Sequence, residues 1–279
     1  MYRKILAAVN EYTNSETAAR YALALARACG AKLTLVFASK EPVDKGALGK
    51  AESAMKRLFI EAQMAGVETG SLVLTGDPVK NILEVVDLEG VDAAFAASRH
   101  EDTERRFFVR TVARELMLKL PCAAAVVRVA GMGKSLPRNI LVTLRGGRAF
   151  NEERAYFTAK LAEGFGAGVT LLHLPEPVTR FFHGEVQMTS AERAARIPAD
   201  VREFARYLES LGIPHVVKTA RGKTSSAITV EAAQRKNDLI LMGAAQRGLI
   251  ASIVKGNPVE DVMKSPPCSL LVFKPRRKT

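Results

Sequence analysis

The sequence predicts an α/β protein made of two tandem domains, each with a five-stranded parallel sheet. Short apolar segments alternate with amphipathic helical segments, which is typical of strands joined by helical crossovers. The pattern occurs twice in 279 residues, a length that suits two domains of ordinary size. The segment between the two copies, residues 130–137, is rich in residues that break regular structure. We therefore expect domains at residues 1–130 and 137–279.

Four landmarks recur in the same order in both halves, which indicates an internal repeat. Residues 4–9 match 139–144, residues 30–36 match 166–172, residues 75–78 match 221–223, and Pro121-Cys122 matches Pro267-Cys268.

In the first half, apolar runs predict the strands and apolar residues at helical spacing predict the helices. The expected strands are residues 4–9, 32–37, 71–75, 93–97 and 123–129. The expected helices are residues 16–29, 50–65, 78–86 and 109–118. Gly30 ends the first of these helices and Pro78 begins the third. Residues 42–49 are expected to be a loop.

The second half repeats this plan, with a longer loop at residues 175–190. The expected strands are residues 139–144, 169–174, 215–219, 239–242 and 269–273. The expected helices are residues 150–165, one that Pro198 interrupts and that ends at Leu211, then 224–235 and 258–264.

Parallel sheets of this kind bind ligands beyond the carboxyl ends of the strands, where the strand order reverses. In the second half, Leu144-Arg145, Leu174 and Met242-Gly243 should meet at that edge. Gly243 allows a sharp turn and leaves no Cβ to block a ligand.

A helix start follows that turn at Gly256-Asn257-Pro258, with Asn257 as N-cap and Pro258 at the first helical position. The free N–H groups of such a helix end can bind an anion.

This arrangement resembles the universal stress protein family. Its nucleotide-binding members carry glycine, two residues, glycine, nine residues, glycine, and then serine or threonine. Gly243 and Gly256 match the first and third places, whereas Gln246 and Asn257 stand at the second and fourth. The resemblance implies a Rossmann-like fold, similar to the adenine-nucleotide alpha hydrolases, and adenine-nucleotide binding such as ATP in the C-terminal domain.

The first half departs further from the family's motif. The four signature positions hold Ala97, His100, Arg110 and Thr111, which disfavours nucleotide binding there.

The family also has an aspartate after the first strand. Asn10 holds that place in the first half and Arg145 in the second. An arginine accepts no hydrogen bond but can bind phosphate.

The resemblance further implies that the last strands of the two halves lie side by side. The chain is then an internal pseudo-dimer, with residues 123–129 beside 269–273. We expect two separate sheets in this arrangement, not one continuous sheet through both halves.

The formal net charge of +12 is unevenly placed. Residues 1–133 carry 18 Lys and Arg against 16 Asp and Glu, so the second half holds most of the excess. A basic half suggests an anionic partner, although a well-solvated basic surface explains the charge equally well. Cations expected on loops at the ligand edge are Arg145, Arg148, Arg221, Lys223, Arg247 and Lys255. Arg276, in the C-terminal tail, is expected to be a solvated surface residue.

Several classes of protein are disfavoured by the sequence. No apolar run approaches the roughly 18 residues of a membrane span, and no signal peptide is evident. Three cysteines that lie far apart argue against disulfides and fit a reducing cytoplasm. Four histidines lack metal-ligand spacing, so no metal site is predicted. No catalytic residues emerge, and His173 is expected to pack in the core.

These observations lead us to predict a cytoplasmic, non-enzymatic stress-response protein that binds a ligand or partner proteins, with a homodimer of the tandem chain as one assembly. The first alternative is a nucleotide-binding stress sensor that uses the C-terminal domain and hydrolyses ATP slowly. The second is a basic module that binds anionic lipid or nucleic acid. Nucleic acid ranks last because aromatic residues make up only 6% and no nucleic-acid motif appears. The predicted ligand-binding residues are Leu144, Arg145, Leu174, Met242, Gly243, Gln246, Arg247, Gly256 and Asn257.

Overall fold

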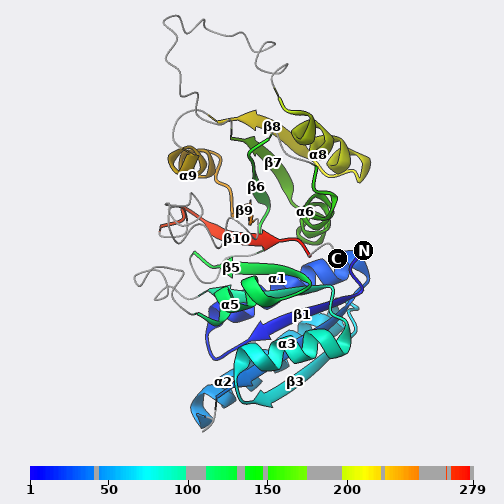
Figure 1. Ribbon diagram of the computed structural model, residues 1–279, viewed down its shortest axis with the longest axis vertical. Helices are drawn as coiled ribbons and strands as arrows, with labels where there is room; N and C mark the ends of the chain where they lie inside the picture. The colour runs from blue at the N-terminus through cyan, green and yellow to red at the C-terminus, as the bar shows by residue number, and fades with distance from the viewer. Residues whose placement is uncertain are drawn as a thin grey trace, which may run out of the picture.

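The structure, a computed structural model, describes residues 1–40, 44–98, 111–130, 136–146, 150–174, 197–220, 224–244, 262 and 265–276. Its strands form one ten-stranded sheet in the order β3-β2-β1-β4-β5-β10-β9-β6-β7-β8. Figure 1 shows the two halves stacked along the longest axis, with β5 and β10 where they meet.

The strands are β1 (Lys4–Val9), β2 (Lys32–Ser39), β3 (Thr69–Thr75), β4 (Ala93–Ser98), β5 (Ala123–Arg128), β6 (Asn139–Leu144), β7 (Gly168–His173), β8 (His215–Thr219), β9 (Leu239–Gly243) and β10 (Ser269–Lys274). The helices are α1 (Thr13–Cys29), α2 (Lys45–Met64), α3 (Pro78–Glu89), α5 (Val112–Lys119), α6 (Glu152–Phe165), α8 (Ala199–Ser210) and α9 (Thr224–Gln234).

The two halves have the same topology, as the repeat predicts. All strand pairs within a half are parallel. In the first half β1 lies between β2 and β4, and in the second β6 lies between β7 and β9. The chain thus reverses its direction of travel across the sheet beside β1 and again beside β6. The α/β fold class and its tandem arrangement are confirmed.

The halves join through antiparallel pairing of β5 and β10. Val126 pairs with Val272, and each is the fourth residue of its own six-residue strand. Because equivalent residues of the repeat face one another, a pseudo-two-fold axis passes through this pair. The adjacency of the last strands is confirmed. The expectation of two separate sheets is wrong, because this pairing makes the sheet continuous.

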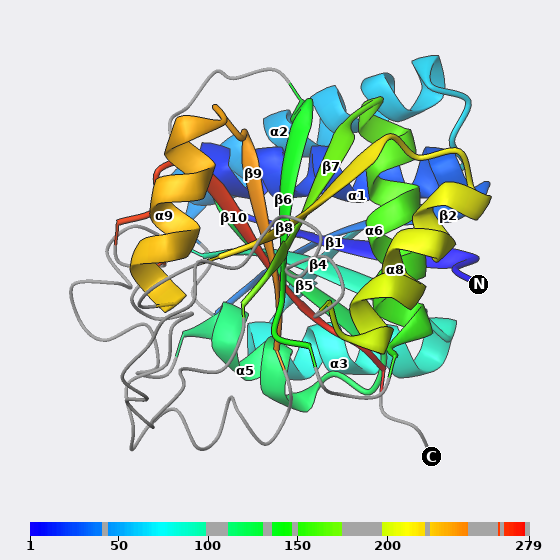
Figure 2. The ribbon, with the colours of Figure 1, turned by 90° about the horizontal axis from the view of Figure 1, so that it is seen from above.

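Helices cover both faces of the sheet, and alternate residues of each strand point to opposite faces. Ile5 and Ala7 belong to the buried cluster that includes residues of α1, α2, α6 and α8, whereas Leu6 belongs to the cluster that includes residues of α3, α5 and α9 on the opposite face. In Figure 2, α6 and α8 lie on one side of the strands of the second half and α9 lies on the other.

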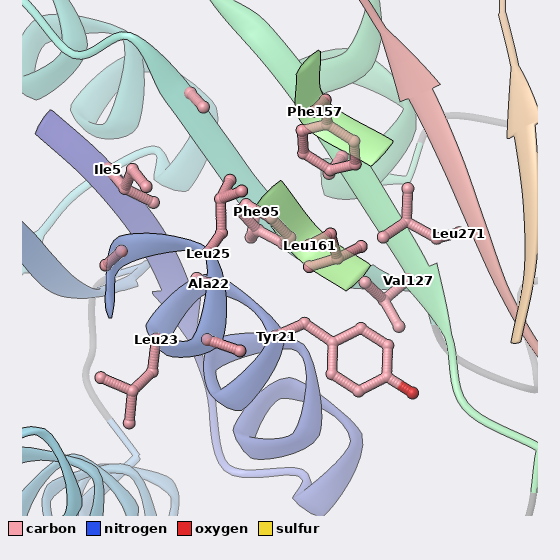
Figure 3. Close-up of a cluster of buried hydrophobic side chains, with 14 of the residues drawn as sticks. Ile5, Tyr21, Ala22, Leu23, Leu25, Phe95, Val127, Phe157, Leu161 and Leu271 are labelled. Carbon is pink, nitrogen blue, oxygen red and sulfur yellow. The ribbon is translucent and has the colours of Figure 1, made fainter. Parts of the chain in front are cut away.

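On the face that carries Ile5 and Ala7, the hydrophobic core continues from one half into the other across β5 and β10, and aromatic residues contribute to it. Phe157 of α6 stacks on Phe273 with ring centroids 4.2 Å apart, and on Phe95 of the first half at 5.9 Å. Tyr21 of α1 packs edge-on against Phe165 at 4.9 Å. Figure 3 shows Phe157 beside strands of both halves. The two halves therefore share one hydrophobic core on this face.

Two expectations need correction. Residues 45–49 belong to α2 and not to a loop, because the Asp44 carboxylate caps that helix by accepting from Gly46 N and Ala47 N. Arg276 is not a solvated tail residue. Its Nε donates to Glu153 Oε1 at 3.0 Å, and its Nη1 lies 3.9 Å from Asp92 Oδ1 of the first half.

Within the described ranges, no helix combines the length and the apolar character that crossing a membrane requires.

Candidate ligand-binding site

Three strand ends of the second half meet at one edge of the sheet, as predicted. Leu144 pairs with His173 at the ends of β6 and β7, and Leu174 N donates to Leu144 O at 2.7 Å. Met242 and Gly243 end β9, which runs parallel to β6 on its other side. The side chains of Leu144, Leu174 and Met242 are buried, so these residues pack in the core beneath the edge.

The turn after β6 is tightly packed. Arg145 is exposed at the end of β6, and Gly146 follows with a φ of 73°. A Cβ at Gly146 would lie 2.6 Å from Pro198 Cγ and 2.7 Å from His173 Cε1. His173 is itself buried, and its Nδ1 lies 3.4 Å from Leu144 O. The structure therefore places His173 in the core, as predicted, and leaves Arg145 accessible at the edge.

A second cation reaches this edge from the first turn of α6. Arg154 Nη2 donates a hydrogen bond to Thr143 O at 2.7 Å, which holds the guanidinium at the end of β6. A Cβ built on Gly243 would lie 2.7 Å from Arg154 Nη1 and 2.8 Å from its Cζ. The guanidinium therefore fills the space beside Gly243, between β6 and β9. The expectation that this space is left for a ligand is corrected: the chain's own arginine occupies it.

Arg154 lacks an electrostatic partner within the described ranges. Its Nε is buried and has no hydrogen-bond partner. Burial lowers the pKa of the Arg154 guanidinium to about 10, which still leaves it charged at neutral pH. A cation that is removed from water without a counter-charge costs free energy. An anion that bound at this edge would supply the missing partner.

At the equivalent edge of the first half, several polar groups bond to the chain itself. Asn10 Oδ1 accepts from Tyr12 N at 3.0 Å, and Asn10 N donates to Ser15 Oγ at 3.0 Å. Thr111 Oγ1 caps α5 by accepting from Arg114 N at 3.3 Å. The side-chain oxygens of Asn10 and Thr111 thus serve a local turn and a cap. Asn14, whose Nδ2 donates to Ser98 O at the end of β4 at 3.0 Å, keeps a buried Oδ1 that has no hydrogen-bond partner among the described residues.

Sequence reasoning missed Arg154, although the repeat contains a signal for it. The left-handed glycines Gly30 and Gly166 end α1 and α6. The twelfth residue before each is Ala18 in the first half and Arg154 in the second. An arginine that replaces a fully buried alanine of the other copy marks a change in the second half.

The strand that lies beside Arg154, β9, also differs from its counterpart β4 in the first half. Ala97 is the fifth residue of β4, and Gly243 is the fifth residue of β9. The first half thus has Ala97 where the second has Gly243, and Ala97 packs against the apolar cluster that contains Ala18. Relative to the first half, the second half therefore lacks a methyl group at position 243 and has a guanidinium at position 154.

The remaining predicted site residues lie outside the described residues. They are Gln246, Arg247, Gly256 and Asn257, together with Arg148, Arg221, Lys223 and Lys255, and with His100 and Arg110 of the first half. The described residues contain no group of three or more His, Cys, Asp or Glu side chains that could hold a metal ion.

The fold and this edge define a tandem α/β protein with a candidate binding site at the carboxyl ends of its strands. The model of the universal stress protein family matches residues 1–128 and again residues 138–274. This chain therefore belongs to the universal stress protein family.

Individual relatives agree with this assignment. A universal stress protein of Thermus aquaticus, described as lying in the QAH/OAS sulfhydrylase 3' region, is 28% identical over 128 residues, which are 44% of this chain and 89% of the relative. A solved universal stress protein of Archaeoglobus fulgidus is 17% identical with a TM-score of 0.63, and the match covers 98% of this chain and 96% of that one.

A protein in another setting has the same tandem fold. The cytoplasmic domain of a prokaryotic cation chloride cotransporter is 14% identical with a TM-score of 0.59, and the match covers 99% of this chain and 96% of that one. Likeness at this level shows the fold alone, so the function must be argued from the site.

Proposed function

We propose that this universal stress protein acts in the stress response by binding a small anionic ligand, without catalysis, at the carboxyl edge of β6, β7 and β9. An adenine nucleotide such as ATP is the first candidate ligand. The proposed setting is the cytoplasm, and the proposed partners are other proteins that sense whether the ligand is bound.

The observation that carries this proposal is the difference between the two equivalent edges. In the first half, Asn10 and Thr111 are engaged by the backbone of their own turns. In the second half, Arg145 is exposed at the end of β6, and no side-chain hydrogen bond of Arg145 is found among the described residues. A fold that is repeated so closely would not need this difference if both edges served only as turns.

The chemistry of the second edge suits an anion. Arg145 follows the end of β6, and the guanidinium of Arg154 lies beside Gly243 of β9. The strand order reverses between these two strands, which is where such sheets bind ligands. Most of the excess positive charge of the chain also lies in this half. A basic surface raises the local concentration of anions and speeds their association.

Calorimetric titration with ATP tests the proposal. Each charge-assisted hydrogen bond to phosphate contributes on the order of 1.5–3 kcal/mol, so Arg145→Ala should weaken binding by about tenfold or more. Arg206→Ala is the matched control, because Arg206 is an exposed arginine on α8 with no hydrogen bond or ion pair to the described residues. The effect of Arg145→Ala should persist at physiological salt.

Two outcomes would contradict the proposal. If both variants weaken ATP binding equally, and only at low salt, the second half attracts anions through its overall positive charge and the edge is not a specific site. If the wild-type chain releases phosphate from ATP at a rate that Arg145→Ala abolishes, the protein is a slow ATPase and the non-catalytic part of the proposal is wrong.

A further inference from the structure

We propose that Arg154 is the half-buried cation that recognises an oxyanion group of the ligand, and that position 243 is glycine in order to admit its guanidinium. This inference rests on the proposed function and identifies the chemistry of the same site. It assigns the recognition of charge to a residue in the first turn of α6, and not only to the residues that follow β9.

The geometry places the guanidinium at the centre of the edge. Its Nη2 is fixed by the Thr143 carbonyl of β6, and its Nη1 lies in the space beside Gly243 of β9. These strands are neighbours in the sheet, and the strand order reverses between them. The Arg154 guanidinium therefore bridges the two strand ends at which a ligand of this fold is expected.

Within the described residues, the hydrogen bonds that Arg154 makes leave donors unused. A guanidinium carries five N–H donors, and here one nitrogen donates to Thr143 O while the buried Nε has no partner. A planar guanidinium can donate to an oxyanion through two parallel hydrogen bonds. Phosphate and carboxylate both have this geometry, so the experiment must distinguish them.

The first half supplies a built-in control for this assignment. Where the second half combines Arg154 with Gly243, the first combines Ala18 with Ala97. The double variant Arg154→Ala with Gly243→Ala thus reproduces a combination that the same fold already accommodates. It removes the cation, and the added Cβ refills part of the space that the guanidinium leaves, so the variant is expected to fold.

Three variants and four probes make the test. The variants are Arg154→Ala with Gly243→Ala, Gly243→Ala alone and the control Arg206→Ala. The probes are ATP, adenosine, inorganic tripolyphosphate and citrate. Circular dichroism and the thermal midpoint establish that each variant is folded before binding is measured.

We expect the double variant to lose about tenfold or more in affinity for ATP, because it lacks the charge-assisted hydrogen bonds. Gly243→Ala should weaken ATP binding in the same direction although Arg154 is still present, because its Cβ displaces the guanidinium. Arg206→Ala should bind as the wild type does. Binding of tripolyphosphate but not citrate identifies phosphate as the group recognised, and the reverse identifies carboxylate.

The outcomes separate this inference from the function on which it rests. If Arg145→Ala weakens ATP binding while both position-243 variants bind ATP as the wild type does, the edge is a site and Arg154 has only a structural role. If adenosine binds as tightly as ATP, a nucleoside site stands and oxyanion recognition is wrong. If the wild type binds none of the anions, the proposed function and this inference both fail.

Discussion

Gly164 of α6 lies so close to Ala24 of α1 that a Cβ on the glycine would overlap the Ala24 carbonyl. The Arg27 guanidinium secures the same contact by donating from Nη2 to Gly164 O at 2.6 Å. These helices belong to different halves, so this contact sets how closely the halves approach.

Gly164→Ala should therefore destabilise the chain by about 1–3 kcal/mol, because backbone must move to admit the methyl group. Gly49→Ala is the matched control. Gly49 also lies within a helix, but a Cβ there meets nothing within 4 Å, so alanine should stabilise by about 0.4–1 kcal/mol. Urea unfolding of the wild type and the two variants measures whether each substitution lowers or raises the free energy of unfolding. Equal effects of the two substitutions would show that the close contact is unimportant.

Phe157→Ala should cost about 3–5 kcal/mol, as expected for truncating a fully buried aromatic residue. The side chain stacks on Phe95 of one half and Phe273 of the other, so its loss should loosen both halves together. Urea unfolding of this variant, monitored by circular dichroism, should remain a single transition with a midpoint at a lower urea concentration than in the wild type. Two separated transitions would mean that each half is stable without the shared core.

Glu16→Gln tests an ion-pair network that joins α1 and α2. The hydrogen bond from Arg57, with a further contribution from Arg20, lowers the pKa of the Glu16 carboxyl. Because the folded-state pKa is lower than the unfolded value, the stabilisation is complete above about pH 4.3 and is lost as the pH falls through the folded-state pKa.

The substitution should therefore cost about 1–3 kcal/mol at pH 7 and distinctly less at pH 3. Unfolding free energies at both values check this, with Glu203→Gln on the exposed surface of α8 as the control. A cost for Glu16→Gln that does not change with pH would contradict the assignment.

Arg276→Ala should destabilise the chain by about 1–2 kcal/mol, since it removes a charged hydrogen bond to the largely buried Glu153 carboxylate. Arg206→Ala should change stability by less than about 0.5 kcal/mol. Thermal unfolding of both variants separates an ion pair at the junction from a solvated tail charge. Identical midpoints would restore the interpretation of Arg276 as a surface residue.

Much of the fold was predictable because its signals are local. The strands at residues 4–9, 139–144 and 215–219 have the boundaries that their apolar runs indicate. The start of α2 was not predicted because Gly46 and Gly49 are each unfavourable in a helix by about 1 kcal/mol. The Asp44 cap and the packing of Leu48 against the core outweigh that local preference.

The site was less predictable because its main contact is distant in sequence. The strand ends follow from topology, so Leu144, Leu174 and Met242 could be placed from the chain alone. That Arg154 fills the space of a missing Cβ depends on the packing of the first turn of α6 beneath β9. A glycine followed by a turn has the same appearance in sequence whether it makes room for a ligand or for an arginine.

The axis at Val126 and Val272 has a consequence for how many sites a molecule carries. In a symmetric pair of separate subunits, any substitution is made at both sites at once. Here the two copies belong to one polypeptide, so an arginine can replace alanine at one edge while the other edge keeps its apolar packing. One copy can then act mainly as a scaffold while the other changes its chemistry, and under the proposed function we expect the molecule to saturate with a single equivalent of ligand.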